Sequence, residues 1–148
     1  MKISTKGRYA VRILLDIAMH QGDGYVAMRD IARRQQISKK YADQIAMQLG
    51  QSCLLSAVRG HTGGYRLMIP ASDITILQII TLMEGNLTPV ACMDQEPNRC
   101  PRCNYCMTLP VWQGLEKVIS DYLGSITLQD LVDRGPEQPE LEDMSVPT

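Results

Sequence analysis

Residues 28–68 read MRDIARRQQISKKYADQIAMQLGQSCLLSAVRGHTGGYRLM, and this segment carries the strongest fold signals of the chain. Its first eight residues, 28–35, place apolar side chains at helical spacing and predict a short helix. Ser38 is a favourable N-cap residue and opens a second predicted helix over residues 39–49, which Gly50 would end. Two helices joined by a turn of a few residues form a helix-turn-helix.

The second half of the stretch predicts a β-hairpin. Two short apolar segments, residues 53–58 and 65–68, flank a glycine-rich loop over residues 59–64. A helix-turn-helix followed directly by a hairpin is a winged helix, in which the hairpin is the wing. Cys53 lies inside the first apolar segment, and we expect it to be a small core residue.

Outward from this stretch, apolar periodicity and capping patterns predict four more helices: about residues 5–21, from Thr75 to Glu84, about Pro110 to Leu123, and a short last helix capped by Thr127. The third of these has a heptad-like apolar seam: Trp112, Leu115, Ile119 and Tyr122. The seam suits either an intramolecular core face or a subunit interface. The interface is favoured because so long a helix follows a nearly complete DNA-binding module.

The fold class expected is therefore mainly α with a small β-hairpin wing, a winged helix-turn-helix plus a long C-terminal dimerisation helix. We divide the chain into a DNA-binding domain over residues 1–70 and a segment with a cysteine loop and dimerisation helices over residues 71–134. The tail, residues 135–148, has four acidic residues, three prolines and no basic residue, and it is predicted to be disordered.

Composition sets the broad class. A chain of 148 residues with 45% apolar and 21% charged residues has enough apolar surface for one folded core. No apolar run approaches the ~18–20 residues that span a membrane. Arg12 and Asp16 interrupt the apolar stretch that a signal peptide would need. We expect a soluble, cytoplasmic protein with no membrane partner.

Charge is distributed unevenly along the chain. Residues 1–66 carry eleven Lys and Arg residues against four acidic ones, whereas residues 67–148 carry four against twelve. A basic half of this kind suits a polyanionic partner such as double-stranded DNA, although a solvated basic face would look the same.

Two parts of the winged helix supply the candidate DNA contacts. If Ile45 and Leu49 face the core, the polar residues of the second helix and Met47 are free to enter a groove, where Lys, Gln and Asp can read phosphates or base edges. An Arg at the hairpin tip suits a narrow minor groove. The candidate set is Ser38, Lys39, Lys40, Tyr41, Asp43, Gln44, Arg59, Gly60 and His61. The alternatives are an ordinary polar helix face and a plain hairpin turn.

Four of the five cysteines are clustered, with the spacing Cys92-x7-Cys100-x2-Cys103-x2-Cys106. An odd cysteine count in a chain without a signal peptide argues against a disulfide framework. Thiolates at this spacing select zinc or an iron–sulfur cluster, and Pro101 keeps the segment out of a helix. Zinc sites more often pair two distant CxxC motifs, so the spacing fits a cluster better.

Three motifs in the first half of the chain carry a family resemblance: STKGRYAV at 4–11, ISxxYxxQ at 37–44 and LSxVRGxxGGYxL at 55–67. Together with Cys92, Cys100, Cys106, Trp112 and the ITLxxL ending at 126–131, they resemble the winged-helix repressors related to the iron–sulfur cluster regulator IscR. That family also includes the nitric-oxide sensor NsrR. The resemblance covers residues 1–134.

The resemblance implies a homodimer joined by the long C-terminal helix, with the cluster loop near that helix and the partner's DNA-binding domain. It also implies that Ser38, Asp43 and Arg59 contact DNA.

The chain departs from the IscR-type pattern at the fourth cluster ligand. The pattern places a ligand His three residues after its third cysteine, where this chain has Leu109. Other members take an acidic residue or His from the partner's first helix, where this chain has Arg8 and Arg12. Cys103, additional to the three-cysteine pattern, is then the natural fourth ligand. The departure leaves the cluster type and its signal open, with a 2Fe–2S cluster preferred over 4Fe–4S.

The sequence thus predicts a regulator that binds a palindromic operator under the control of an iron–sulfur cluster that senses iron, redox or nitric oxide status. It is not an enzyme, since no nucleophile–base or carboxylate pair is suggested. The alternatives are a zinc-stapled DNA-binding regulator without sensing and a small electron-transfer protein. The basic half and the wing argue against the electron-transfer protein.

Overall fold

A computed structural model of the chain describes residues 1–136. The acidic tail predicted over residues 135–148 lies, from residue 137 onward, outside the described residues. The described elements are α1 Thr5–His20, α2 Met28–Gln35, α3 Lys39–Gln51, β1 Leu55–Val58, β2 Gly64–Leu67, the short 3-10 turn η1 Ala71–Asp73, α4 Ile76–Glu84, the short 3-10 turn η2 Ala91–Met93, α5 Leu109–Gly124 and α6 Leu128–Arg134. This mainly helical fold with one hairpin confirms the predicted winged helix-turn-helix.

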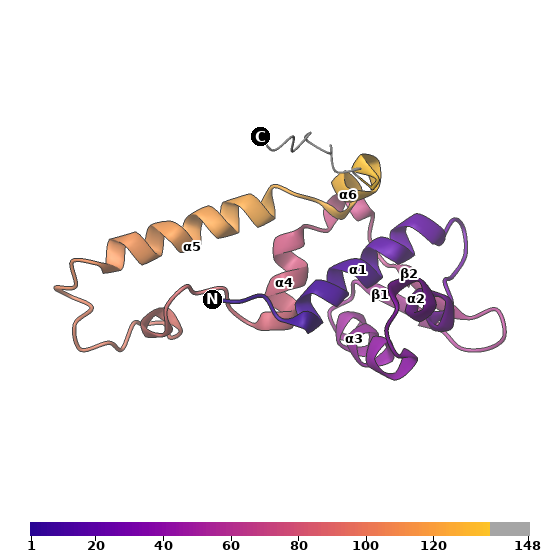
Figure 1. Cartoon of the computed structure of the whole chain (residues 1–148), viewed down its shortest axis with the longest axis horizontal. Helices are drawn as coiled ribbons and strands as arrows, with labels where there is room; N and C mark the ends of the chain where they lie inside the picture. Colours follow the sequence, from indigo (N-terminus) through magenta and orange to yellow (C-terminus); the bar gives the residue numbers. More distant parts are fainter. Residues whose placement is uncertain (137–148) are drawn as a thin grey trace, which may run out of the picture.

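Helix α1 is the centre of the globular body, and α2, α3, α4 and α6 all pack against it (Figure 1). Its inward face is mainly apolar, and Ile13, Leu14 and Ile17 are fully buried there. They share one core with the inward residues of the other elements, among them Ile45 of α3 and Ile79 of α4. Burying a large aliphatic side chain contributes ~1.5–3 kcal/mol, so this core fixes the orientation of the helix-turn-helix.

The helix-turn-helix is formed by α2 and α3. Helix α2 ends at Gln35, and its C-cap residue Gln36 turns the chain with a left-handed backbone conformation (φ 56°, ψ 44°). Ser38 caps α3, as predicted: its side chain accepts a hydrogen bond from the Tyr41 amide at 3.1 Å. The prediction that Gly50 ends this helix is wrong, because α3 continues to Gln51. Burial of the helix's inner face outweighs the ~1 kcal/mol that an internal glycine costs.

The wing is an antiparallel hairpin in which Leu55 faces Leu67 and Val58 faces Gly64. The expectation that Cys53 is a core residue is wrong, because Cys53 is exposed and precedes β1. It has the left-handed φ of 61° that reverses the chain between α3 and β1. This reversal turns the Cys53 side chain outward, while the neighbouring leucines enter the core.

Two capping boxes begin α4 and α6, as predicted. The hydroxyl of Thr75 accepts from the Gln78 amide and that of Thr127 accepts from the Asp130 amide, and both return bonds are present. The two helix starts lie side by side, since Thr75 pairs with Thr127 in an isolated β-bridge. The pairing holds α6 against the body, to which the chain returns after the cysteine loop and α5.

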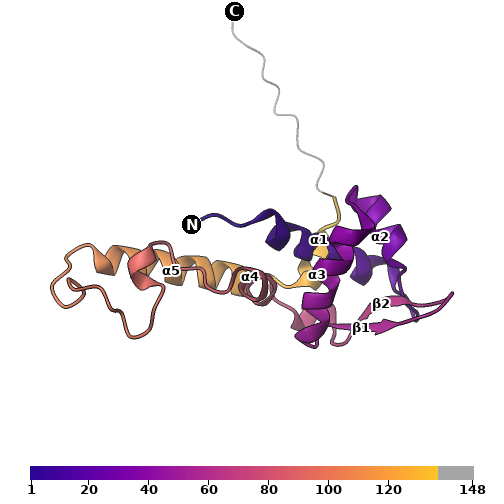
Figure 2. The ribbon, with the colours of Figure 1, turned by 90° about the horizontal axis from the view of Figure 1, so that it is seen from below.

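Helix α5 and the preceding cysteine loop project away from this body as an arm, on the side opposite the wing (Figure 2). The loop runs outward from α4 and α5 returns, so the cysteines lie toward the outer part of the arm (Figure 1). No residue of α5 is buried. Among the described residues, none of the helices combines the length and apolar character needed to cross a membrane.

Candidate nucleic-acid interface and cysteine loop

The outer face of α3 is polar and open to solvent. Its inner face is buried through Ala42, Ile45, Ala46 and Leu49. The side chains of Lys39, Lys40, Gln44 and Met47 are therefore exposed on the opposite face, as the sequence predicts. Lys39 forms an ion pair with Asp43 one turn further on, at 2.7 Å between Nζ and Oδ2. The hydrogen bond that Lys39 donates to Asp43 raises the pKa of Lys39.

Tyr41, one of the predicted contact residues, is half-buried. Its ring packs edge-on against the Tyr9 ring of α1, with 6.0 Å between the ring centroids. The guanidinium of Arg12 lies 4.8 Å from the centre of the same Tyr9 ring. Tyr41 therefore anchors the start of α3 to α1, and only part of its surface is open to a ligand.

The tip of the wing presents Arg59, Gly60 and His61, all of them exposed. Gly60 has a φ of 113°, a conformation that glycine adopts without strain. At Gly63 a Cβ atom would lie 2.1 Å from the Val58 carbonyl oxygen, so only glycine fits this turn. The glycines thus allow a tight tip that holds Arg59 in solvent.

Helix α3, the recognition helix of the helix-turn-helix, and the wing face one shared hollow of ≈ 430 Å³. It is lined by residues from both, including Asp43, Met47, Val58, Arg59 and Tyr65. Tyr65 connects β2 to the chain before α2 through backbone hydrogen bonds with Val26 at 2.8 and 2.9 Å. Burial, with a smaller contribution from Asp43, raises the pKa of Tyr65. The geometry therefore places α3 and the hairpin as two sides of one surface.

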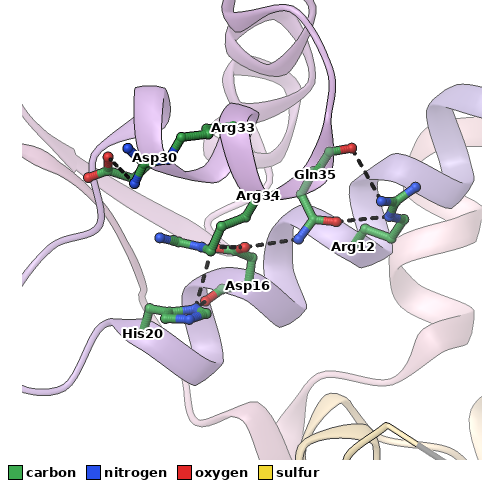
Figure 3. Close-up of polar contacts among 7 residues, drawn as sticks. All are labelled: Arg12, Asp16, His20, Asp30, Arg33, Arg34 and Gln35. Carbon is green, nitrogen blue, oxygen red and sulfur yellow. Dashed lines mark hydrogen bonds and ion pairs between the residues drawn. The ribbon is translucent and has the colours of Figure 1, made fainter. Parts of the chain in front are cut away.

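A buried carboxylate joins α1 to α2 (Figure 3). Asp16 is 3% exposed and accepts three hydrogen bonds from Arg34: Nη2 donates to Oδ1 at 2.5 Å, and Nε donates to Oδ2 at 2.9 Å and to Oδ1 at 3.2 Å. The Gln35 amide also donates to Oδ2 at 2.9 Å, and Gln35 in turn accepts from Arg12 Nε at 2.8 Å. Hydrogen bonding to Asp16 raises the pKa of Arg34.

Sequence reasoning missed this cluster. The Arg34 side chain of α2 turns toward Asp16 and is 31% exposed. A single signal was present: an acidic residue on the predicted first helix among strongly apolar neighbours. The cluster fixes the angle between α1 and α2, and so it supports α3.

The four clustered cysteines lie on the irregular segment between α4 and α5. Cys92 is exposed within η2, and Cys100, Cys103 and Cys106 follow in half-buried positions. The Cys103 amide donates to the Cys100 carbonyl at 3.1 Å, which places these two residues in one turn. Hydrogen bonds from the hydroxyl and the backbone amide of Thr108 lower the pKa of Cys106, which favours its thiolate.

These donors fit a soft metal centre by their chemistry. All four are free thiols, and apart from Cys92 in the short turn η2 they lie on irregular backbone, which leaves them able to converge. The described loop conformation does not assemble them: within residues 1–136, no group of three or more His, Cys, Asp or Glu could hold a metal ion. The four-cysteine ligand set stays a prediction.

Helix α5 carries a stripe of solvent-exposed apolar residues at heptad-like spacing: Val111, Leu115, Val118 and Tyr122. The seam predicted from the sequence is therefore divided between two faces. Ile119 packs against the core, as does the nearby Leu123, while Leu115 and Tyr122 face solvent. An exposed apolar stripe on a projecting helix is typical of an interaction surface.

A winged helix-turn-helix with an exposed, lysine-bearing recognition helix defines the chain as a DNA-binding transcriptional regulator. Comparison with known proteins gives the family. Residues 3–134 match the family model named Rrf2, described as an iron-dependent transcriptional regulator. The chain belongs to the Rrf2 family, and as a transcriptional regulator it is not an enzyme.

Individual relatives agree with this assignment. The chain is 39% identical to the transcriptional regulator IscR of Yersinia pseudotuberculosis over 132 residues, covering 89% of this chain and 79% of the relative. The solved structure of T. potens IscR matches with a TM-score of 0.74 and 35% identity, covering 93% of this chain and 90% of that one. CymR, titled the global cysteine regulator of B. subtilis, matches with a TM-score of 0.74 and 32% identity, covering 92% and 99%.

Proposed function

We propose that this chain is a cytoplasmic, homodimeric regulator whose affinity for a palindromic operator is set by an iron–sulfur cluster on its cysteine loop. Residues 1–70 would bind DNA, and residues 71–134 would carry the cluster and the dimer contacts. The observation that carries the proposal is the loop itself: four free thiols within fifteen residues on an arm of a chain in a family described as iron-dependent.

The DNA-binding surface would consist of the outer face of α3 and the tip of the wing. Lys40 and Gln44 are exposed where the helix would enter the major groove, and Arg59 is exposed at the tip. Ser38, Lys39, Tyr41, Asp43, Gly60 and His61 complete the proposed set. The shared hollow between α3 and the hairpin supports contact of both elements with one duplex.

Dimerisation would pair the exposed stripes of two α5 helices. The stripe leaves four apolar side chains in water on a helix that buries no residue of its own. A two-fold dimer presents two recognition helices related by symmetry, and such a dimer reads a palindromic site.

Cys92, Cys100, Cys103 and Cys106 of one subunit would hold the cluster, with a 2Fe–2S form preferred. A cluster bound there would supply a centre that responds to iron supply, oxidation or nitric oxide. The loop would change conformation with the state of the cluster. It would take one conformation when its four cysteines hold a cluster and another when they are free thiols. Coupling between such states changes affinity by ~5–150-fold.

Anaerobic purification tests the proposal directly. We expect a coloured protein with about as much inorganic sulfide as iron, visible absorbance and an iron–sulfur Mössbauer signal. The same preparation should retard a duplex selected from a random pool, and its affinity should change when the cluster is removed with chelator and oxidant. A colourless protein that purifies with zinc would contradict the sensing function and leave the DNA-binding function intact.

Zinc is the second candidate for the loop. Four thiolates are also a common structural zinc set, and the described geometry favours neither metal. A zinc-stapled chain would bind DNA with an affinity that does not respond to oxidant at low dose. Metal analysis and colour separate the two candidates.

A further inference from the structure

The last turn of α4 immediately precedes the cysteine loop and touches both α1 and the recognition helix. Helix α4 ends at Glu84, and the chain then turns at Gly85, which has a φ of 88°. Two groups in the last turn of α4, the Glu84 side chain and the Leu82 carbonyl, accept hydrogen bonds from other elements. Both links cross to segments more than thirty residues away in the sequence.

The first link docks Glu84 on the beginning of α1. Its Oε1 accepts from the Ser4 amide at 3.1 Å and from the Ser4 hydroxyl at 2.5 Å. Ser4 is the N-cap of α1, where a negative charge is stabilised by the helix dipole. Gly7 makes room for the carboxylate: a Cβ atom there would lie 2.3 Å from Glu84 Oε1.

The second link reaches the recognition helix directly. Gln48 lies on α3 on the side that faces the body, and its Nε2 donates to the Leu82 carbonyl at 3.1 Å. Its Oε1 accepts from the Lys6 ammonium of α1 at 2.9 Å. Gln48 therefore joins α1, α3 and the end of α4 through one half-buried side chain.

We propose that Gln48 and Glu84 are positioning residues that transmit the conformation of the cysteine loop to the recognition helix of the same chain. The inference rests on the proposed function, because it assigns the route by which loop state would change operator affinity. A shift of the loop acts first on Gly85 and Glu84. The Leu82 carbonyl and the Glu84 carboxylate then move relative to α3 and α1, and Gln48 carries the displacement to α3.

Three variants and one control test the route in the full-length chain. Gln48→Met keeps the length of the side chain but removes both hydrogen bonds. Glu84→Gln keeps the shape and removes the charge. Gly7→Ala displaces the flexible end of Glu84 without altering Glu84 itself. The control is Gln51→Met, on the same helix at an exposed position.

The first readout is operator affinity in two loop states. Each protein is measured with a duplex selected from a random pool by the wild-type chain, once as reduced metal-free protein and once after anaerobic reconstitution with iron and sulfide. The wild type and the control should show a ratio of dissociation constants of ~5–150 between the states. The three variants should lose most of this ratio while they still bind the duplex in both states.

The second readout needs no metal. In the reduced metal-free chain, backbone hydrogen exchange of α3 should increase in Gln48→Met, and exchange at the start of α1 should increase in Glu84→Gln and Gly7→Ala. A merely structural role would weaken binding equally in both states and leave the ratio unchanged. If all three variants keep the wild-type ratio of dissociation constants between the two loop states, the route is wrong and the proposed function stands. A wild-type ratio near one overturns both.

Discussion

Replacing Asp16 by Asn should lower the free energy of unfolding far more than removal of an acidic residue at the surface. Asp16 is the one buried charged residue within residues 1–136, and Arg34 and Gln35 both donate to its carboxylate. Asparagine keeps one acceptor but presents an amide donor where a second acceptor oxygen stood. That donor then faces the donors of Arg34 or Gln35.

The structure sets the magnitude. Breaking a buried ion pair by removing one partner costs ~3–5 kcal/mol, because the remaining charge is left buried. Arg34 is 31% exposed and can turn partly toward water, which recovers some of that cost. Gln35 cannot relieve the conflict by flipping, because its oxygen already accepts from Arg12. We therefore expect a loss of about 2–3 kcal/mol, equivalent to a fall in Tm of roughly 4–12 °C for a chain of this size.

Urea unfolding at fixed protein concentration measures the effect, since a dimer would make stability depend on concentration. Asp121→Asn is the matched control. Asp121 pairs with Lys117 on α5, and both side chains are more than 60% exposed, so the loss should be under about 0.5 kcal/mol. Equal losses in the two variants would refute the argument that Asp16 joins α1 to α2.

The other predictions concern DNA, the dimer and the cysteine loop. Arg59→Ala should weaken operator binding by about 1–3 kcal/mol in a fluorescence-anisotropy titration, and unchanged affinity would remove the wing from the interface. Lys40→Ala should weaken all duplexes alike and reduce the slope of log K against log salt by about one; an unchanged slope would mean that it touches no phosphate. Val118→Glu should convert dimer to monomer in sedimentation-velocity runs, and a persistent dimer would place the interface elsewhere. Cys103→Ser should lose the visible absorbance or become oxygen-labile, whereas Cys53→Ser should keep it. A Cys103→Ser protein with full cluster content would show that another group completes the site.

Local signals predicted most of the winged helix. The bounds of α2 and the capping boxes at Thr75 and Thr127 follow from neighbouring residues alone, because capping and helical periodicity are local effects. Gly50 and Cys53 were misassigned for one reason. The chain reverses at Cys53, three residues after Gly50, where the propensity of glycine suggests a stop. Burial of the inner face of α3 extends the helix past Gly50.

The contacts that sequence reasoning missed are all long-range. Glu84 meets Ser4 across eighty residues, and Asp16 meets Arg34 across eighteen. Neither pairing has a local pattern, since each depends on how α4 and α2 pack on α1. The division of the α5 seam between two faces has the same origin, because Ile119 packs against the core while other seam residues face solvent. The described loop does not bring the four thiols together, and their convergence on a metal or cluster stays a prediction.

If two exposed α5 stripes pair as proposed, the energetics of that pairing link the dimer to the cysteine loop. The four apolar residues of the stripe are on average a little over half exposed, so covering them would recover about 4–7 kcal/mol per protomer at ~1.5–3 kcal/mol for a fully buried side chain. Association costs about 4–15 kcal/mol, which is the same order as the gain from both protomers. The stripe alone would therefore give the proposed dimer a stability close to marginal. Helix α5 begins three residues after Cys106, so loop residues adjoin the stripe and can add or withhold the contacts that decide the balance. By the reciprocity of linked equilibria, a loop state that strengthened the proposed dimer would also be the state that this dimer stabilises.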